Sequence, residues 1–314
     1  MRFLVILSVL AIALPLGSAL TFWQSPRKSK SPPVNCKLLI LPGFGNDSMD
    51  YLMPNSLVDS LKKRGWQDDQ ICVLPVKRLD WLKVFFRGAL DLDFWRSNAP
   101  PTKPAFSWYL ERIAAVVKEV RYDERIIILG HSAGGWLGRA AMGYGSNDKE
   151  GLSFIDINKV LGIVTLGAPN MQPPPGVMDM TRGALRITNE NFPGSFHAPS
   201  TFYVTVIGNA IQGRKQERKS ALEPTTIAGF AFNSYEAVCG DGTTFGDGVV
   251  PLCSGHLSDA IQLTLDGVLH SINAPESWYG SDSILDQWHD TMLVEIERMQ
   301  TTAKGGFQFS GIFQ

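Results

Sequence analysis

The sequence has no excess of charge of either sign. Its 314 residues include 29 lysines and arginines and 30 aspartates and glutamates, which gives a formal net charge of −1 at pH 7. Proteins that bind nucleic acid or other phosphate-rich partners carry a basic excess, so the balance argues against that class. Hydrophobic residues make up 44% and charged residues 19% of the chain. These values are typical of a globular, enzyme-like protein with a sizeable core.

Long hydrophobic runs are absent except at the N-terminus. There an apolar run covers residues 3–16 and is followed by Gly-Ser-Ala at 17–19. The run is short for a membrane span, and the small residues after it fit a signal peptidase site. We therefore predict a signal peptide over 1–19, cleaved after Ala19. The alternative is an uncleaved anchor that extends through Trp23.

Acidic residues are missing from 20–35, a basic segment rich in serine and proline. It is interpreted either as a solvated linker or as a second, transit-like targeting signal. A signal peptide followed by such a segment resembles the two-part plastid leader of algae with complex plastids. Those leaders place an aromatic residue directly after the cleavage point, whereas Phe22 comes two residues later here. The predicted destination, through the secretory pathway, is a plastid or else the ER lumen or cell exterior.

Cysteine is scarce, with only four residues in the chain: Cys36, Cys72, Cys239 and Cys253. An even number after an ER-type leader is compatible with one or two disulfides. Cys239 and Cys253 are the favoured pair because they bracket a short glycine-rich loop. In a plastid the same thiols could stay reduced, so the cysteine count does not decide the compartment.

Apolar segments without polar alternation alternate with helical patterns along the rest of the chain. This predicts an α/β fold with a mostly parallel sheet that is buried on both faces and flanked by helices. The predicted strands lie within 36–45, 71–76, 125–132, 159–169, 201–208 and 260–267, and the predicted helices within 50–64, 104–121, 133–144 and 282–300. We assign this domain to residues 36–302 and a C-terminal tail to 303–314.

Three segments do not fit this repeat, namely about 77–103, 170–200 and 209–246. Each follows the carboxyl end of a predicted strand, where open α/β sheets place their ligand crevice, so we expect caps or lids. Aromatic and aliphatic residues of the first segment either line an acyl pocket or interface or form the core of the cap: Trp81, Leu82, Phe85, Phe86 and Trp95. The basic run at 211–220 is expected to be a solvated loop, with contact to a lipid surface as the alternative.

Residues 130–134, Gly-His-Ser-Ala-Gly, match the G-x-S-x-G pattern of a nucleophile elbow. In such an elbow a strand turns sharply into a helix and exposes the serine at the apex. The pattern alone is weak, and an idle serine in a glycine-rich turn is the alternative. Here an aliphatic strand precedes it and a helix-compatible segment follows it, so Ser132 is the candidate nucleophile.

A serine nucleophile needs an orienting carboxylate, which in this chain order lies between the serine and the histidine. Asp247 is the favoured acid because it sits in the glycine-flanked turn Gly-Asp-Gly-Val-Val-Pro after the fifth strand. Asp241 is the alternative acid. An aspartate in a turn also has an ordinary role as a turn former.

The base should be a histidine downstream of that acid. His270 follows the sixth strand in a loop that can reach the elbow, and it is the favoured base. His256 and His289 are the alternatives, although His289 has the spacing of a core residue in the last helix. His131 adjoins the serine and is expected to point elsewhere, and His197 precedes both candidate acids.

An oxyanion intermediate also needs hydrogen-bond donors. One is the backbone N–H of Ala133, directly after the nucleophile, and the other should come from the loop after the first strand. In that loop, Leu-Pro-Gly-Phe-Gly at 41–45, the best candidate is the N–H of Phe44. The alternative role of this loop is a simple tight turn from strand to helix.

Together these residues resemble the α/β-hydrolase superfamily. The chain is most similar to lipase-like hydrolases of plants, algae and cyanobacteria, and distantly similar to the GPI inositol-deacylase group. The resemblance covers about 36–299 and is carried by LPGFG, GHSAGGW, TLGAPN, GDGVVPL, GVLHS and WYGS. Pro42-Gly43 stands where many lipases have His-Gly, so this loop departs from the usual lipase pattern at the second oxyanion donor.

The resemblance implies hydrolysis of a carboxylic ester, including lipid acyl esters, through an acyl-enzyme. It implies no metal and no organic cofactor. The implied partner is a small-molecule or lipid ester, with peripheral membrane contact as an addition. Two alternatives stay open: a thioesterase or acyltransferase with the same triad, and a catalytically silent binding protein of the same fold.

Overall fold

The computed structural model describes residues 31–145, 155–217 and 223–308. Its core is a six-stranded sheet in which every neighbouring pair is parallel. The strand order is β2-β1-β3-β4-β5-β8. The strands are β1 (Cys36–Leu41), β2 (Ile71–Val73), β3 (Arg125–His131), β4 (Val160–Leu166), β5 (Phe202–Asn209) and β8 (Ile261–Asp266). The predicted α/β fold with a parallel sheet is confirmed.

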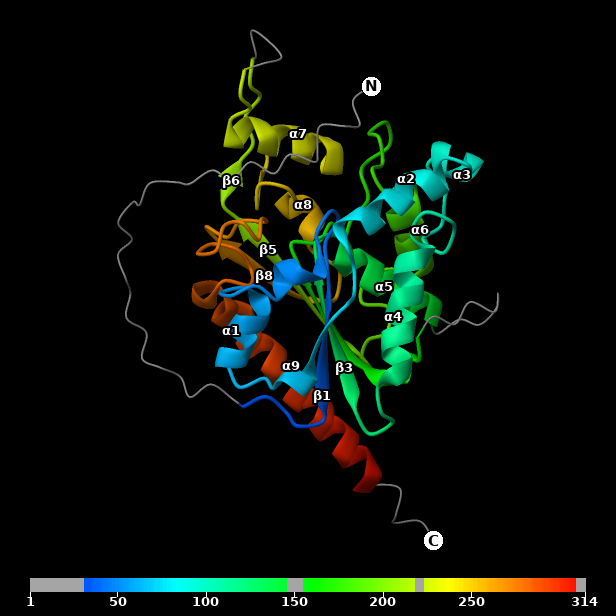
Figure 1. The fold of residues 1–314 in the computed structure, drawn as a ribbon, viewed down its shortest axis with the longest axis vertical. Helices are drawn as coiled ribbons and strands as arrows, with labels where there is room; N and C mark the ends of the chain where they lie inside the picture. Colours follow the sequence, from blue (N-terminus) through cyan, green and yellow to red (C-terminus); the bar gives the residue numbers. More distant parts are fainter. Residues whose placement is uncertain (1–30, 146–154, 218–222, 309–314) are drawn as a thin grey trace.

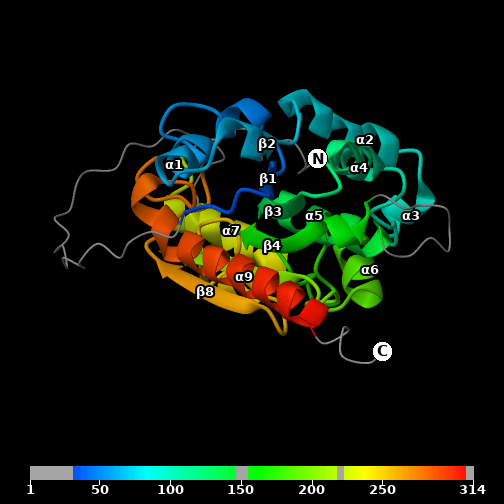
Figure 2. The same cartoon turned by 90° about the horizontal axis from the view of Figure 1, so that it is seen from below.

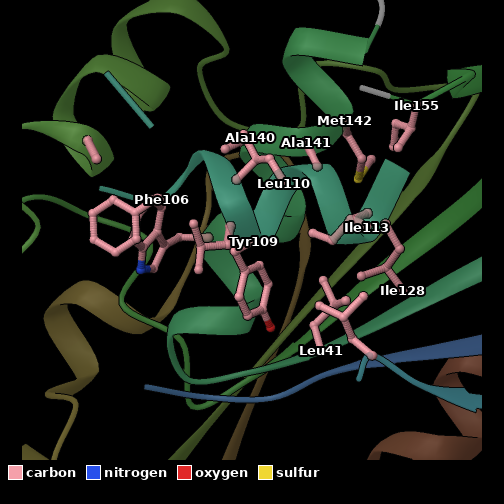
Figure 3. Close-up of a cluster of buried hydrophobic side chains, with 14 of the residues drawn as sticks. Leu41, Phe106, Tyr109, Leu110, Ile113, Ile128, Ala140, Ala141, Met142 and Ile155 are labelled. Atoms are coloured by element: carbon pink, nitrogen blue, oxygen red, sulfur yellow. The ribbon is translucent and has the colours of Figure 1, made fainter. Parts of the chain in front are cut away.

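Helices cover both faces of this sheet. Helices α4 (Ser107–Glu119) and α5 (Ala133–Gly145) lie on one side, and α1 (Leu57–Lys63) and α9 (Asp282–Gln308) lie on the other (Figures 1 and 2). Consecutive residues such as Ile127 and Ile128 are therefore both fully buried, which explains the unbroken apolar strands. Figure 3 shows side chains of α4 and α5 packed against Leu41 and Ile128 of the sheet.

Two helices differ from their predicted ranges. The helix predicted over 50–64 is divided into a 3-10 helix, η1 (Ser48–Tyr51), and α1. Pro54, which has no backbone N–H, and Asn55, with a φ of 59°, lie between the two and break the helix. Helix α9 ends at Gln308, beyond the predicted end at 300 and within the predicted tail.

The three insertions follow β2, β4 and β5. The first contains η3 (Arg78–Trp81), α2 (Leu82–Gly88) and α3 (Leu92–Trp95), the second contains α6 (Ala184–Asn191), and the third contains β6 (Ile211–Gln212), α7 (Ile227–Cys239) and β7 (Phe245–Gly246). Helices α2, α3 and α7 lie at one end of the molecule, and the C-terminal end of α9 lies at the other (Figure 1). The remaining short elements are η2 (Asp68–Gln70), η5 (Ile157–Lys159) and α8 (Leu252–Gly255).

The four cysteines are free thiols, so the favoured Cys239–Cys253 disulfide is not formed in this structure. Burial, and then interaction with the Cys239 thiol, raises the pKa of the Cys253 thiol to about 12. A protonated thiol is a poor nucleophile, which disfavours disulfide exchange at this position.

Several predictions concern residues that the structure does not describe. The signal peptide at 1–19, most of the 20–35 segment, the end of the 211–220 basic run and the last part of the tail lie outside the described residues. Within the described ranges, no helix has both the length and the hydropathy of a membrane span.

Candidate active site

Ser132 lies at the junction of β3 and α5 with strained backbone angles. Its φ is 51°, a left-handed value that costs a non-glycine residue about 1–3 kcal/mol. The turn is tight because Gly130 contacts Gly135 of α5, and Gly134 contacts the carbonyl group of Leu41. A side chain at either glycine would collide with these backbone atoms, which explains the glycines of the G-x-S-x-G pattern.

Helix α5 begins directly after the serine, so its amino end faces the hydroxyl. The first backbone N–H groups of a helix have no acceptor within the helix and carry partial positive charge. The Ala133 N–H makes no hydrogen bond among the residues that the structure describes. It is therefore available to bind an oxyanion beside Ser132.

The loop after β1 lies against the serine. A Cβ atom on Gly43 would be 2.7 Å from the Cβ of Ser132, so this approach requires glycine. The Gly43 N–H donates a hydrogen bond to the Tyr51 hydroxyl oxygen (3.0 Å). The N–H of Phe44 has no acceptor in the described part of the chain. Of these two loop amides, only the one predicted from the sequence is free to donate.

Asp247, directly after β7, and His270, in the loop after β8, are in direct contact. The Nδ1–H of His270 donates to Oδ2 of Asp247 (2.7 Å), and the backbone N–H of His270 donates to the Asp247 carbonyl oxygen (2.9 Å). A carboxylate only accepts, so the proton of a neutral His270 ring is on Nδ1. Its Nε2 is then left with a lone pair, as a general base requires.

The Asp247 carboxylate is buried, with 1% of its surface exposed, and both of its oxygens are hydrogen-bonded. Oδ1 accepts from the backbone N–H groups of Val249 (2.9 Å) and Val250 (2.7 Å). Oδ2 accepts from the Tyr279 hydroxyl (2.7 Å) in addition to His270. Four donors thus hold the carboxylate in one orientation toward the imidazole.

The alternative acid and bases have other partners. Asp241 accepts from the N–H and hydroxyl of Thr243, within its own turn. His256 is hydrogen-bonded to Thr205 and Thr264, and His289 is a buried core residue that accepts from the Trp66 indole N–H. All five histidines lie in the described ranges, and only His270 contacts a carboxylate.

No hydrogen bond joins the Ser132 hydroxyl to the His270 ring in the described part of the molecule. His131 adjoins Ser132 in the chain, and its ring centroid is 4.9 Å from that of His270. Catalytic hydrogen bonds often tighten only when substrate is bound, so the missing bond does not exclude His270 as the base.

The model of the Alpha/beta hydrolase family matches residues 38–306, which is most of the chain. The chain belongs to this family. Family membership agrees with the sheet order, in which β1 and β3 are adjacent and the loops that follow both strands meet at Ser132. Open α/β sheets bind ligands at such a point, where the chain reverses its direction of progress along the sheet.

Solved structures of other α/β hydrolases are similar at low identity. The mature lipase BlEst2 of Bacillus licheniformis is 14% identical, with a TM-score of 0.49, and the match covers 86% of this chain and 96% of that one. The metagenomic carboxyl esterase MGS0156 is 11% identical, with a TM-score of 0.49 over 90% and 82% of the two chains. The thioesterase RedJ of Streptomyces coelicolor is 13% identical, with a TM-score of 0.26 over 63% and 82%. A comparison with curated proteins gave no match.

Tyr279 contacts the candidate acid, and the sequence did not indicate this residue. Its hydroxyl donates to Asp247 and accepts from the Gly208 N–H (2.8 Å). Burial, and then the neighbouring Asp247 charge, raises the pKa of Tyr279 well above its ordinary value, so the hydroxyl keeps its proton. The WYGS motif contained this residue, but nothing in the local pattern indicated contact with an aspartate 32 positions away.

His131 makes buried contacts that the sequence did not indicate. Its Nε2–H donates to the backbone carbonyl oxygen of His270 (3.1 Å), and its Nδ1 therefore accepts from the Tyr51 hydroxyl (2.7 Å). Because Tyr51 also accepts from Gly43, one buried chain of hydrogen bonds links the loop after β1 to the loop after β8 that contains His270. Burial, and then the neighbouring His270, lowers the pKa of His131 to about 3, so its ring stays neutral at pH 7.

Metal ligands do not gather in the part of the protein that is described. No cluster of three or more His, Cys, Asp or Glu side chains there could hold a metal ion. The candidate site offers instead the Ser132 hydroxyl, the hydrogen-bonded His270–Asp247 pair and the backbone N–H groups of Ala133 and Phe44. Those are the components of nucleophilic acyl transfer.

Proposed function

We propose that this α/β hydrolase is a serine esterase that cleaves carboxylic esters, with lipid acyl esters as its main substrates. The observation that carries the proposal is the buried Asp247 carboxylate hydrogen-bonded to Nδ1 of His270, in a chain whose Ser132 has left-handed backbone angles at the turn from β3 to α5. A buried carboxylate that fixes one tautomer of a histidine is costly to build and is typical of a catalytic triad.

In this proposal the Ser132 hydroxyl attacks the ester carbonyl while Nε2 of His270 takes its proton. The imidazolium that forms is stabilised by Asp247, which stays ionised. The N–H groups of Ala133 and Phe44 bind the negative oxygen of the tetrahedral intermediate, at about 3–4 kcal/mol for each well-placed donor. His270 then gives its proton to the leaving alcohol, and water releases the acid from the acyl-enzyme by the reverse sequence of steps.

Two features support lipid esters as the substrate class. The narrower sequence resemblance is to lipase-like hydrolases of plants, algae and cyanobacteria. In addition, the loop that supplies Phe44 is bordered by aromatic side chains, since the Phe44 ring lies 5.1 Å from that of Trp81 and 6.3 Å from that of Phe85. An apolar border of this kind suits an acyl chain better than a charged leaving group.

The substrate proposal is tested with a panel of acyl donors. Purified protein and its Ser132→Ala variant are incubated with short soluble esters, mono- and diacyl glycerolipids and an acyl-CoA, and the released acid is measured. We expect the parent protein to release acid from the glycerolipids faster than from the acyl-CoA, and the variant to release none above background. Preference for the acyl-CoA would favour a thioesterase, and transfer to an added alcohol an acyltransferase.

The compartment is a separate proposal that rests on the N-terminal sequence. A signal peptide at 1–19 with the basic 20–35 segment would direct the enzyme into the secretory pathway, and then to a plastid or to the ER lumen and exterior. Fusing residues 1–35 to a fluorescent protein in an algal cell with complex plastids distinguishes the two destinations. Fluorescence that remains in the cytosol would exclude both.

Tyr51 offers a test of the hydrogen-bond chain between the two loops. The Tyr51→Phe variant removes the acceptor of the Gly43 N–H and the donor to His131, at a buried position that keeps its ring. Because both loops then lose part of their alignment, we expect kcat for a soluble ester to fall about 10- to 100-fold with little change in KM. Steady-state kinetics and a thermal melt measure the two effects separately.

Another buried tyrosine, Tyr203, provides the matched control. It is 6% exposed, and its hydroxyl accepts from the His197 backbone N–H (3.3 Å), which belongs to neither loop. We expect Tyr203→Phe to lower stability by a similar amount with a smaller effect on kcat. Equal losses of kcat in the two variants would mean that Tyr51 acts through general stability rather than through the site.

A further inference from the structure

The first insertion exposes an unusual number of large apolar side chains. Seven of them lie within 79–95, and Phe86 and Leu90 are 72% and 92% exposed. We call this set the α2–α3 patch: Leu79, Leu82, Phe85, Phe86, Leu90, Leu92 and Trp95. Isolated exposed apolar residues are ordinary, but a contiguous group on one short segment marks an interaction surface.

Helix α2 is apolar on two faces rather than one. Its inner face, with Val84 and Gly88, is buried, as is Trp81 in the turn before it. Its outer face carries Leu82, Phe85 and Phe86, which are three and four residues apart and so share one side of the helix. A helix at the surface of a water-soluble protein normally turns polar side chains outward. The outer face of α2 therefore lacks the polarity that contact with water alone would favour.

The segment that carries the α2–α3 patch is held in place by contacts with the rest of the protein. The Trp81 indole N–H donates to the Asn46 carbonyl oxygen (3.0 Å), which ties the segment to the loop after β1. A Cβ atom on Gly88 would be 2.6 Å from the Phe94 ring, so α2 and α3 are closely packed. The Arg182 guanidinium of the second insertion lies over the Trp95 ring, 5.8 Å from its centroid. The exposed side chains thus project from a fixed surface.

The patch is continuous with the candidate active site. Phe85 lies 6.3 Å from the Phe44 ring, and Phe44 is itself 42% exposed. Phe44 follows Gly43, at which an added Cβ atom would be 2.7 Å from the Cβ of Ser132. An acyl chain that crosses from the patch to the serine would therefore stay against apolar side chains.

The charged residues around the α2–α3 patch indicate the kind of partner that it binds. Residues 77–103 include six basic and three acidic side chains, although the whole chain has a net charge of −1. Arg87 and Arg96 are exposed beside Phe86 and Trp95 of the patch. Aromatic and aliphatic side chains with adjacent arginines suit the interface of a membrane that contains anionic lipids, where the rings enter the headgroup region and the cations meet phosphate.

We propose that the α2–α3 patch binds the surface of anionic lipid membranes and that lipid esters pass from that surface along Phe44 to Ser132. The binding step stands on the exposure and charge of the patch. The passage to Ser132 rests on the proposed function.

Vesicle flotation tests the binding step. The full chain, as the Ser132→Ala variant so that no lipid is consumed, is mixed with vesicles of phosphatidylcholine alone or of equal parts phosphatidylcholine and phosphatidylglycerol. We expect flotation with the mixed vesicles and at least about 10-fold weaker partitioning when Phe86→Ser and Leu90→Ser are added. We expect Arg87→Gln with Arg96→Gln to reduce the preference for anionic vesicles several-fold.

The matched control is Tyr122→Ser. Tyr122 is 89% exposed, as accessible as the patch residues, but it precedes β3 at the amino end of the sheet. This variant should float as the Ser132→Ala parent does, and all variants should keep the parent melting temperature because the changes are on the surface.

Equal flotation of the Phe86→Ser/Leu90→Ser variant and the parent would overturn the proposal, because other segments would then hold the lipid. So would a parent that does not float but forms a dimer that the same substitutions dissociate, since the patch would then bind a second copy. If the Ser132-containing protein floats but hydrolyses no ester, the membrane-binding proposal is supported and the proposed function is contradicted. If it hydrolyses soluble esters but does not float, the proposed function is supported and membrane binding is contradicted.

Discussion

Replacing His270 with alanine is expected to lower kcat for ester hydrolysis by about 10⁴-fold or more while the protein stays folded. Without this imidazole the proposed triad has no group that takes the proton of the Ser132 hydroxyl, and the remaining rate comes from substrate binding and the oxyanion donors. Only 9% of the His270 surface is exposed, so the melting temperature should be measured in parallel with the kinetics.

His256→Ala is the control for this change. His256 lies in the same part of the chain, but its ring is hydrogen-bonded to two threonines and contacts no carboxylate. We expect it to keep kcat within a few-fold of the parent value. Two results would show that His270 is not the base. One is a His270→Ala enzyme that keeps a tenth of the parent kcat, and the other is a His256→Ala enzyme as inactive as His270→Ala.

Asp247→Asn has the second large expected effect, a loss of about 10⁴-fold in kcat at neutral pH. Oδ1 of Asp247 accepts from two backbone N–H groups, so the new amide keeps its oxygen there and turns its NH₂ group toward His270. That group cannot accept from Nδ1, and the imidazole proton moves to Nε2. The ring can then no longer take the proton of Ser132.

The structure supplies a matched control in Asp241→Asn. Asp241 is exposed and its carboxylate binds only its own turn at Thr243. We expect nearly parental kcat from this variant, and from Asp247→Asn a fold that is retained although less stable. If Asp241→Asn lost more activity than Asp247→Asn, the alternative acid would be the functional one.

The sequence was sufficient to predict the sheet because its strands are continuous apolar runs. The segment before Ser132 contains four aliphatic residues, and in the structure all four are buried in β3. A strand buried on both faces leaves this pattern whatever lies around it. The strained turn was also predictable, since only glycine fits where β3, α5 and β1 approach each other.

The partners of the candidate triad were less predictable. Chain order and turn composition favoured Asp247 and His270, and the structure joins these two by a hydrogen bond. Tyr51 and Tyr279 gave no signal, because each contacts the site across a long sequence separation and a buried tyrosine has an ordinary role in a core. Contacts of that kind depend on how the helices and strands pack together. The local spacing of hydrophobic residues in the sequence does not predict them.

Helix α7 in the third insertion was also not predicted from the sequence. The helix has local end signals, since the Thr226 side chain accepts from the Gly229 N–H and Gly240 ends it with a φ of 81°. Its buried residues are few, however: Gly229, Ala231 and Tyr235. It packs mainly against β6 and α8 rather than against a strand of the main sheet.

The most direct test of the central claim, that Ser132 is an activated nucleophile, is labelling with a fluorophosphonate probe followed by mass spectrometry of the labelled peptide. We expect the parent protein to carry the label on Ser132, the His270→Ala variant to react far more slowly and the Ser132→Ala variant not to react. A parent protein that stays unlabelled, or a Ser132→Ala variant labelled as strongly as the parent, would contradict the account and favour a binding protein of this fold.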